Sequence, residues 1–195
     1  MKAGVASFYW SHLSTARCVL DLGCGFGDLG LHKPEPVKLL GLDIKPNVAK
    51  EAAGYHCIQG WDLDTNAPLP FKDNHFGGIV AKDIFEHLWK PRHAVAEMYR
   101  VLRPGGLVLA SVPVARAYRV WDDYTHVRGF TARALRQMFL DGGFEVIAIW
   151  RMGGVPLMSR LNLIRFIPYI LCLPLFDWLW ASSHEIKARK PIREQ

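Results

Sequence analysis

The sequence predicts an open α/β sheet, in which mostly parallel strands alternate with helices. Short apolar runs, each followed by acidic, glycine or proline residues, recur along residues 18–150, with helical patterns in several of the intervals. In addition, the first run leads into a glycine-rich loop, which is typical of ligand binding at the carboxyl end of a strand. Since open sheets bind ligands beyond the carboxyl ends of their strands, we expect the functional residues on that one rim.

Six apolar runs qualify as strands, because their length and flanking turn residues suit buried strands better than helices. They span residues 18–22, 37–44, 55–60, 76–82, 107–112 and 144–150. They would form a mostly parallel sheet joined by right-handed crossovers. Residues 113–130 contain neither a strand nor a helix pattern, and a loop of this length is typical of a lid or a binding loop.

Helical patterns fill most of the intervals. They cover residues 1–17, 45–53, 83–88, 91–101 and 132–140. The fourth of these helices begins at Pro91, which suits a first helical turn, and the fifth follows Thr131, a suitable N-cap. In contrast, Pro34 and Pro36 limit the connection after the first strand to a short and irregular crossover.

Composition sets the class of protein. The 195 residues, half of them hydrophobic, suffice for one domain with a core and exclude wholesale disorder. The net charge of +6 favours anionic partners, although scattered Lys and Arg equally form a solvated surface. The four cysteines show no CxxC pair and no disulfide framework, so we expect reduced thiols in a cytoplasmic protein without structural zinc. We expect no signal peptide.

The stretch Asp-Leu-Gly-Cys-Gly-Phe-Gly, from Asp21 to Gly27, is the most informative one. Gly23 and Gly25 allow a sharp turn and a close approach of the backbone to a ligand, and Cys24 lies between them. The spacing differs from the dinucleotide pattern, and Asp21 would repel a pyrophosphate. The stretch therefore points to a nucleoside that carries a positive charge.

Further carboxylates follow the next strands. Asp43, with Ile44 beside it, is placed to accept both ribose hydroxyls of a nucleoside. Asp62 is placed to accept a hydrogen bond from an adenine amino group, with Leu63 against the ring. We favour Asp62 over Asp64, which suits an Asx turn.

The same residues resemble a known family. Residues 20–27 are similar to the first motif of class I S-adenosylmethionine-dependent methyltransferases. Later landmarks of that family, in particular of its small-molecule, type 11-like branch, are similar to Leu69-Pro-Phe71, Phe85-Glu-His-Leu88, residues 97–106 and Asp141-Gly-Gly-Phe144. The resemblance covers about residues 18–150 and implies a Rossmann-like sheet with flanking helices.

The resemblance implies S-adenosylmethionine as the cofactor. The glycine loop would hold the methionine portion, and Lys82 and Asp83 would border the reactive sulfonium. The expected cofactor-binding set is Asp21, Gly23, Cys24, Gly25, Gly27, Asp43, Ile44, Asp62, Leu63, Lys82 and Asp83.

The sequence departs from the family pattern in three places. Gly77 stands where the family usually has Asp, and prolines break the first crossover. No alternating strand is apparent after Trp150, where the family has an antiparallel last strand. We therefore expect that strand to be missing or replaced by an apolar C-terminal segment, with a methyltransferase domain over 1–151 and an extension over 152–195.

Residues 152–181 are strongly apolar, but their longest uncharged run has 11 residues, whereas a membrane-spanning helix needs about 20. Trp178, Trp180 and the basic end of the chain suit a membrane interface. A cap on the same domain or on a second copy explains the segment equally well, so an oligomer stays open.

Methyl transfer from a sulfonium is an in-line displacement, for which an enzyme mainly supplies orientation and a dry site. A base helps when the acceptor is a hydroxyl or an acidic carbon. His126 in the long loop is the first candidate and His87 the second, and each has a purely structural role as its alternative. Asp83, Glu86 and Tyr124 follow. No cluster of histidines and carboxylates stands at the spacing of metal ligands.

The leading hypothesis is a methyltransferase for a small-molecule or lipid-linked acceptor, cytoplasmic and peripheral on the membrane. Positive charge keeps a nucleic-acid methyltransferase as the runner-up, although the chain has no Asn-Pro-Pro-Tyr-type motif and no appended nucleic-acid module. A non-catalytic cofactor-binding or scaffold protein at a membrane is the third hypothesis.

Overall fold

The computed structural model describes residues 3–45, 54–115, 120–153 and 181–192. Seven strands within these ranges form one sheet in the order β3-β2-β1-β4-β5-β7-β6. They are β1 (Cys18–Leu22), β2 (Lys38–Asp43), β3 (Tyr55–Gly60), β4 (Phe76–Lys82), β5 (Leu102–Pro113), β6 (Glu145–Gly153) and β7 (Ala181–Arg189). The five strands from β3 to β5 pair in parallel, which confirms the predicted mostly parallel open sheet.

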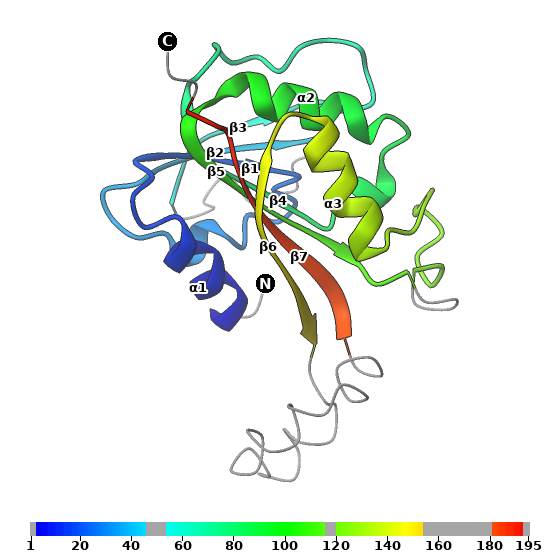
Figure 1. Ribbon diagram of the computed structural model, residues 1–195. Coiled ribbons are helices and arrows are strands. Elements are labelled where there is room, and N and C mark those ends of the chain that lie inside the picture. The colour runs from blue at the N-terminus through cyan, green and yellow to red at the C-terminus, as the bar shows by residue number, and fades with distance from the viewer. Residues whose placement is uncertain (1–2, 46–53, 116–119, 154–180, 193–195) are drawn as a thin grey trace, which may run out of the picture.

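Helices cover both faces of the sheet (Figure 1). The helix α1 (Ala3–His12) lies on one face, where Tyr9 and Leu13 pack with β-strand residues such as Val19. The helices α2 (Pro91–Val101) and α3 (Ala132–Asp141) lie on the other face, over a larger apolar core. As expected, Pro91 stands in the first turn of α2, and the Thr131 side chain caps α3 by accepting a hydrogen bond from a backbone N–H.

The connections near the site are shorter than regular helices. The crossover after β1 contains only a single 3₁₀ turn, η1 (Gly30–His32), as the two prolines predict. The prediction of a helix over residues 83–88 is wrong, because only the 3₁₀ turn η2 (Phe85–His87) forms there. Asp83 adopts φ +50°, a left-handed conformation that cannot begin a right-handed helix. The helix expected over 45–53 lies almost entirely outside the described residues.

The expectation that the last strand is missing is wrong. The strand β7 lies between β5 and β6 and runs antiparallel to both. It comes from within the segment 152–195 that the sequence suggests is an extension, whereas residues 154–180 lie outside the described residues. The sequence of β7 does not read as a strand. Its buried positions include His184 and Glu185 next to Ile186, so apolar and polar residues do not simply alternate.

Two basic residues near the C-terminal end of the chain form contacts within the fold. Lys190 is buried, and its ammonium group donates hydrogen bonds to Asn74 Oδ1 and to the carbonyl oxygens of Tyr99 and Leu102. Arg189 forms an ion pair of 2.7 Å with Glu145 on β6. These two cations therefore hold the sheet together. Among the helices of the described residues, none reaches the length and apolar character that crossing a membrane requires.

Candidate functional site

The glycine loop after β1 turns back on the end of β2. The backbone N–H groups of Gly23 and Cys24 both donate to the carbonyl oxygen of Leu42, at 2.8 and 3.0 Å. Gly23 has φ +80°, and a Cβ atom there would lie 2.5 Å from Ile84 Cδ1. Only glycine fits this position without displacing Ile84. The loop is thereby fixed against the neighbouring strand, with its backbone open to a ligand.

Asp43, at the end of β2, is tied to the same loop. Its Oδ2 accepts a hydrogen bond of 2.8 Å from the backbone N–H of Gly25, and its Oδ1 accepts one of 3.0 Å from Lys45. A carboxylate offers about four lone-pair positions, so two remain for a ligand. The predicted ribose-binding residue is thus held rigidly and keeps acceptor capacity.

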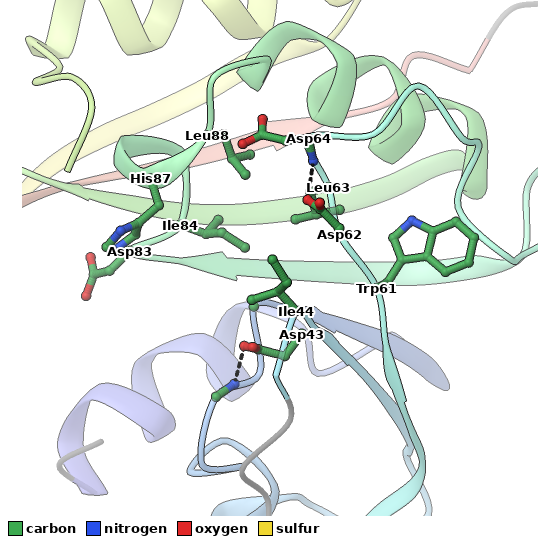
Figure 2. Close-up of a pocket in the computed structure, with 12 residues that line it drawn as sticks. Asp43, Ile44, Trp61, Asp62, Leu63, Asp64, Asp83, Ile84, His87 and Leu88 are labelled. Carbon is green, nitrogen blue, oxygen red and sulfur yellow. Dashed lines mark hydrogen bonds between the residues drawn. The ribbon is translucent and has the colours of Figure 1, made fainter. Parts of the chain in front are cut away.

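The carboxyl ends of β1 to β4 enclose a cavity of about 420 Å³, within the size range of small-molecule and cofactor sites. Figure 2 shows its residues around the open space. The expected residues on its wall are Gly23, Gly25, Asp43, Ile44, Asp62, Leu63, Asp83 and His87. Sequence reasoning missed Trp61, Ile84 and Leu88, which are apolar residues next to predicted ones, and ranked Asp64 below Asp62.

A smaller cavity of about 230 Å³ adjoins the first one and shares Gly23 and Gly25 with it. It is lined by the expected residues Asp21, Cys24 and Lys82. Phe26, Asp28 and Leu29 complete its wall. Of the expected cofactor residues, Gly27 lines neither cavity; its N–H donates to the carbonyl oxygen of Cys24 and closes the turn.

Asp21 is buried at the bottom of the smaller cavity, where the hydroxyl of Tyr55 donates a hydrogen bond to it. Burial raises the pKa of Asp21 to about 7, and the carboxylate of Asp43 acts in the same direction, while Tyr55 and Lys82 oppose the increase. A bound cation would favour the ionised form. The sequence placed Tyr55 only in a strand and gave no sign of this contact.

Asp83 stands at the end of β4 in the strained conformation noted above. Its carboxylate pairs with the ammonium group of Lys82 and accepts a hydrogen bond of 2.7 Å from Ser111 Oγ. Its backbone N–H donates to the carbonyl oxygen of Ser111. These contacts with β5 compensate for the strain and fix the carboxylate at the junction of the two cavities.

The opposite end of the larger cavity holds Asp62 and Asp64. Asp62 Oδ1 accepts a hydrogen bond of 2.9 Å from the backbone N–H of Asp64, and Asp64 Oδ1 accepts one of 2.9 Å from Lys90 before α2. The indole N–H of Trp61 is buried and has no hydrogen-bond partner among the described residues. This end of the cavity thus offers carboxylate acceptors beside Leu63.

The two histidines considered as bases lie together. Their ring centroids are 4.6 Å apart, although His87 belongs to η2 and His126 to the long loop. His126 Nδ1 contacts the carbonyl oxygen of Val120 within hydrogen-bond distance, and His126 Nε2 lies 4.0 Å from a carboxylate oxygen of Glu86. Burial raises the pKa of Glu86 to about 8, and the charge of Asp83 contributes to the increase. His87 lines the larger cavity, whereas His126 does not.

Comparisons with known proteins agree with this geometry. Residues 20–110 match the family described as a methyltransferase domain. A probable S-adenosylmethionine-dependent methyltransferase of Mycolicibacterium smegmatis is 33% identical in an alignment of 144 positions, with 70% of this chain and 55% of that protein covered. The 2-phytyl-1,4-beta-naphthoquinone methyltransferase of Arabidopsis thaliana is 28% identical over 185 residues, with 74% of this chain and 70% of that protein covered.

Among solved structures, a SAM-dependent methyltransferase from Archaeoglobus fulgidus matches with a TM-score of 0.74 over 96% of this chain and 92% of that one. The identity is 19%, so this likeness shows the fold alone. The chain spans little more than half the length of the mycobacterial relative.

Proposed function

We propose, from the match of residues 20–110 to the methyltransferase-domain family, that the protein is a class I, S-adenosylmethionine-dependent methyltransferase of the type 11-like kind that methylates a small-molecule or lipid-linked acceptor. One observation carries the proposal: two adjoining cavities at the carboxyl rim of the sheet, whose shared wall is the glycine loop. Together they are lined by carboxylates, which suit a cationic cofactor.

The cavities suggest how the cofactor lies. The methionine portion would occupy the smaller cavity near Asp21, and the ribose would bind Asp43. The adenine would extend towards Asp62 and Leu63, where its amino group meets a carboxylate acceptor. The sulfonium would then lie near Lys82 and Asp83, where the two cavities meet.

The reaction follows from this arrangement. A lone pair of the acceptor attacks the methyl carbon, the carbon–sulfur bond breaks, and the electron pair stays on sulfur, which leaves neutral S-adenosylhomocysteine. An acceptor hydroxyl or acidic carbon also loses a proton, for which His126 is our first candidate and His87 the second. The buried floor of the site excludes water and holds both partners in line.

The class of acceptor is supported by the relatives. The Arabidopsis protein is named for a naphthoquinone that carries a phytyl chain, an apolar acceptor with a polar ring. The apolar segment 152–181 of the present chain suits contact with such a molecule, or with a membrane that contains it. We therefore place the protein in the cytoplasm and at the membrane surface, with residues 154–180, which lie outside the described residues, as the contact.

Transfer of a labelled methyl group tests the proposal. Purified protein is incubated with methyl-labelled S-adenosylmethionine and cell extract, and label is counted in the lipid, aqueous small-molecule and nucleic-acid fractions. We expect label in the lipid or small-molecule fraction and formation of S-adenosylhomocysteine. Label confined to nucleic acid would instead favour the nucleic-acid reading, and binding without turnover would favour a scaffold.

Asp43 provides a second test that does not require the acceptor. Asp43→Ala is expected to abolish binding of labelled S-adenosylmethionine, and Asp43→Asn, which keeps one oxygen acceptor, to weaken it. Asp122→Ala, a change at an exposed loop carboxylate, serves as the control. Tight binding by a folded Asp43→Ala variant would contradict the ribose role.

A further inference from the structure

Three potential metal ligands meet next to the larger cavity, which one of them, His87, lines. Glu86 and His87 come from η2 and His126 from the long loop, and one ligand atom of each lies within 4.8 Å of the others. Because His126 lies 39 positions after the adjacent pair Glu86 and His87, the sequence spacing gives no sign of the cluster. None of the three belongs to the expected cofactor-binding set, so the cluster requires its own explanation.

The tautomer of His126 directs a lone pair towards the cluster. Its Nδ1 contacts the carbonyl oxygen of Val120, which accepts only, so Nδ1 carries the proton of the neutral ring. Its Nε2 is then an acceptor, and it faces a carboxylate oxygen of Glu86 at 4.0 Å. At 4.0 Å these two atoms are too far apart for a hydrogen bond.

His87 is oriented in the same manner. Thr125 Oγ1 donates its proton to Asp123 at 2.6 Å and therefore accepts a hydrogen bond of 3.0 Å from His87 Nδ1. The neutral His87 ring thus carries its lone pair on Nε2. Histidines that bind metals are oriented in this way, by a hydrogen bond at the nitrogen that does not bind the metal.

Glu86 supplies the independent sign of a ligand. Its side chain is 1% exposed, and neither carboxylate oxygen has a hydrogen-bond partner among the described residues. The cation of Lys82 is paired with Asp83 instead. Burial without a partner disfavours the ionised form of Glu86 and raises its pKa, and a bound cation would supply the missing partner and favour the carboxylate.

We propose that Glu86, His87 and His126 bind a divalent transition-metal cation such as Zn²⁺. Two imidazole nitrogens and one carboxylate suit this class of ion and leave a coordination position open. Ligands at about 2.1 Å from a tetrahedral ion lie roughly 3.4 Å apart, so the 4.0 Å between His126 Nε2 and Glu86 needs only a small contraction.

The open position would face the acceptor, because His87 also lines the larger cavity. A cation there would bind an oxygen atom of the acceptor and lower the pKa of a hydroxyl, which would release its proton to water, so that neither liganded histidine would need to act as the base. This consequence rests on the proposed function, whereas cation binding does not.

The test uses Co²⁺, whose visible absorption reports coordination, on the full chain after treatment with a chelator. We expect one Co²⁺ per chain, displaced by Zn²⁺, and a loss of affinity of at least tenfold in Glu86→Gln and in His126→Gln. The matched controls are Glu35→Gln and His32→Gln, at exposed positions outside the cluster, which should bind Co²⁺ as the unchanged protein does. Circular dichroism shows whether each variant is folded.

Absence of Co²⁺ absorption, or equal affinity in the folded cluster variants and the controls, would overturn the site. Binding of S-adenosylmethionine is measured on the same samples. Cation binding without cofactor binding would uphold the metal site and remove the proposed function, and the reverse result would uphold the function and leave His126 as a base.

Discussion

The hydroxyl of Tyr9 donates a hydrogen bond of 2.7 Å to the buried carboxylate of Glu185, and so joins α1 to β7. The second oxygen of Glu185 accepts a hydrogen bond of 3.0 Å from Ser183. Burial raises the pKa of Glu185 and also that of Tyr9. An internal strand of the sheet can hold this carboxylate because a helix from the other end of the chain supplies the donor.

Replacement of Tyr9 by Phe is therefore expected to lower the free energy of unfolding by about 1–3 kcal/mol, the effect of leaving a buried acceptor without its donor. Unfolding in urea, followed by circular dichroism, measures the difference. Tyr124→Phe is the control, because the Tyr124 side chain is 96% exposed and its hydroxyl is in water. Equal stability of the two variants would mean that the Tyr9 contact contributes nothing.

The buried Asp21 predicts a dependence of stability on pH. Its pKa is raised from 3.8 to about 7 in the folded protein, so between pH 4 and 7 the folded state holds a proton that the unfolded chain has lost. The contribution of Asp21 to the free energy of unfolding is therefore greatest below pH 4 and decreases as the pH rises from 4 to 7. The total change is on the order of a few kcal/mol.

Asp21→Asn keeps an acceptor for Tyr55 but does not titrate. We expect the stability of this variant relative to the unchanged protein to increase steadily from pH 4 to pH 7, as measured by urea unfolding at several pH values. Asp122→Asn removes an exposed carboxylate and should differ from the unchanged protein by a constant amount. A constant difference for Asp21→Asn as well would contradict the burial argument.

Two glycines of the loop after β1 are expected to differ in how much their replacement by alanine lowers stability. A methyl group at Gly23 meets Ile84 at 2.5 Å, whereas one at Gly25 meets no described atom within 4 Å, although both residues have positive φ. Gly25→Ala is expected to cost about 1–2 kcal/mol from its conformation alone, and Gly23→Ala clearly more. Thermal unfolding measures this order.

Both alanine variants should bind S-adenosylmethionine more weakly, because both glycines line the two cavities. If Gly25→Ala bound the cofactor as tightly as the unchanged protein, the assignment of the loop to the cofactor would be wrong. If Gly23→Ala were the more stable variant, Ile84 would have to move at little cost.

Much of the fold was predictable because the parallel strands are buried on both faces and read as apolar runs. Residues 76–82 are such a run, and all but Lys82 are buried in β4. The last strand was not predictable, because buried positions hold His184 and Glu185, and Tyr9, whose hydroxyl makes Glu185 acceptable inside the sheet, lies far away in the sequence. A pattern of hydrophobicity carries no information about such partners.

The candidate site likewise has a part that was predictable from the sequence and a part that was not. The glycine loop, Asp43 and Asp62 were predictable because each follows a strand, and parallel strands bring their carboxyl ends together. The contact between Tyr55 and Asp21 and the cluster around Glu86 depend on how a loop folds over the rim, which no local spacing encodes. Sequence reasoning found the carboxylates but could not find which of them are buried.

Lys190 illustrates the same limit and gives the last prediction. Its ammonium group donates three hydrogen bonds of 2.7 to 2.8 Å to Asn74, Tyr99 and Leu102, and it lies 4.6 Å from the centre of the Tyr99 ring. Lys190→Met keeps the length of the side chain but leaves these acceptors without the charged donor. We expect a loss of about 2–4 kcal/mol in the free energy of unfolding, measured in urea.

The matched control is Lys187→Met, which removes the same charge from β7 at a side chain that is only partly buried. This variant should change stability by less than about 0.5 kcal/mol, as substitutions away from such networks do. A similar small effect for Lys190→Met would mean that the ammonium group is exposed to water in solution. The basic end would then be available to anionic lipid. A large loss of stability would instead show that the Lys190 ammonium group is buried in solution, where its hydrogen bonds hold the end of α2 and the start of β5 against the end of β7.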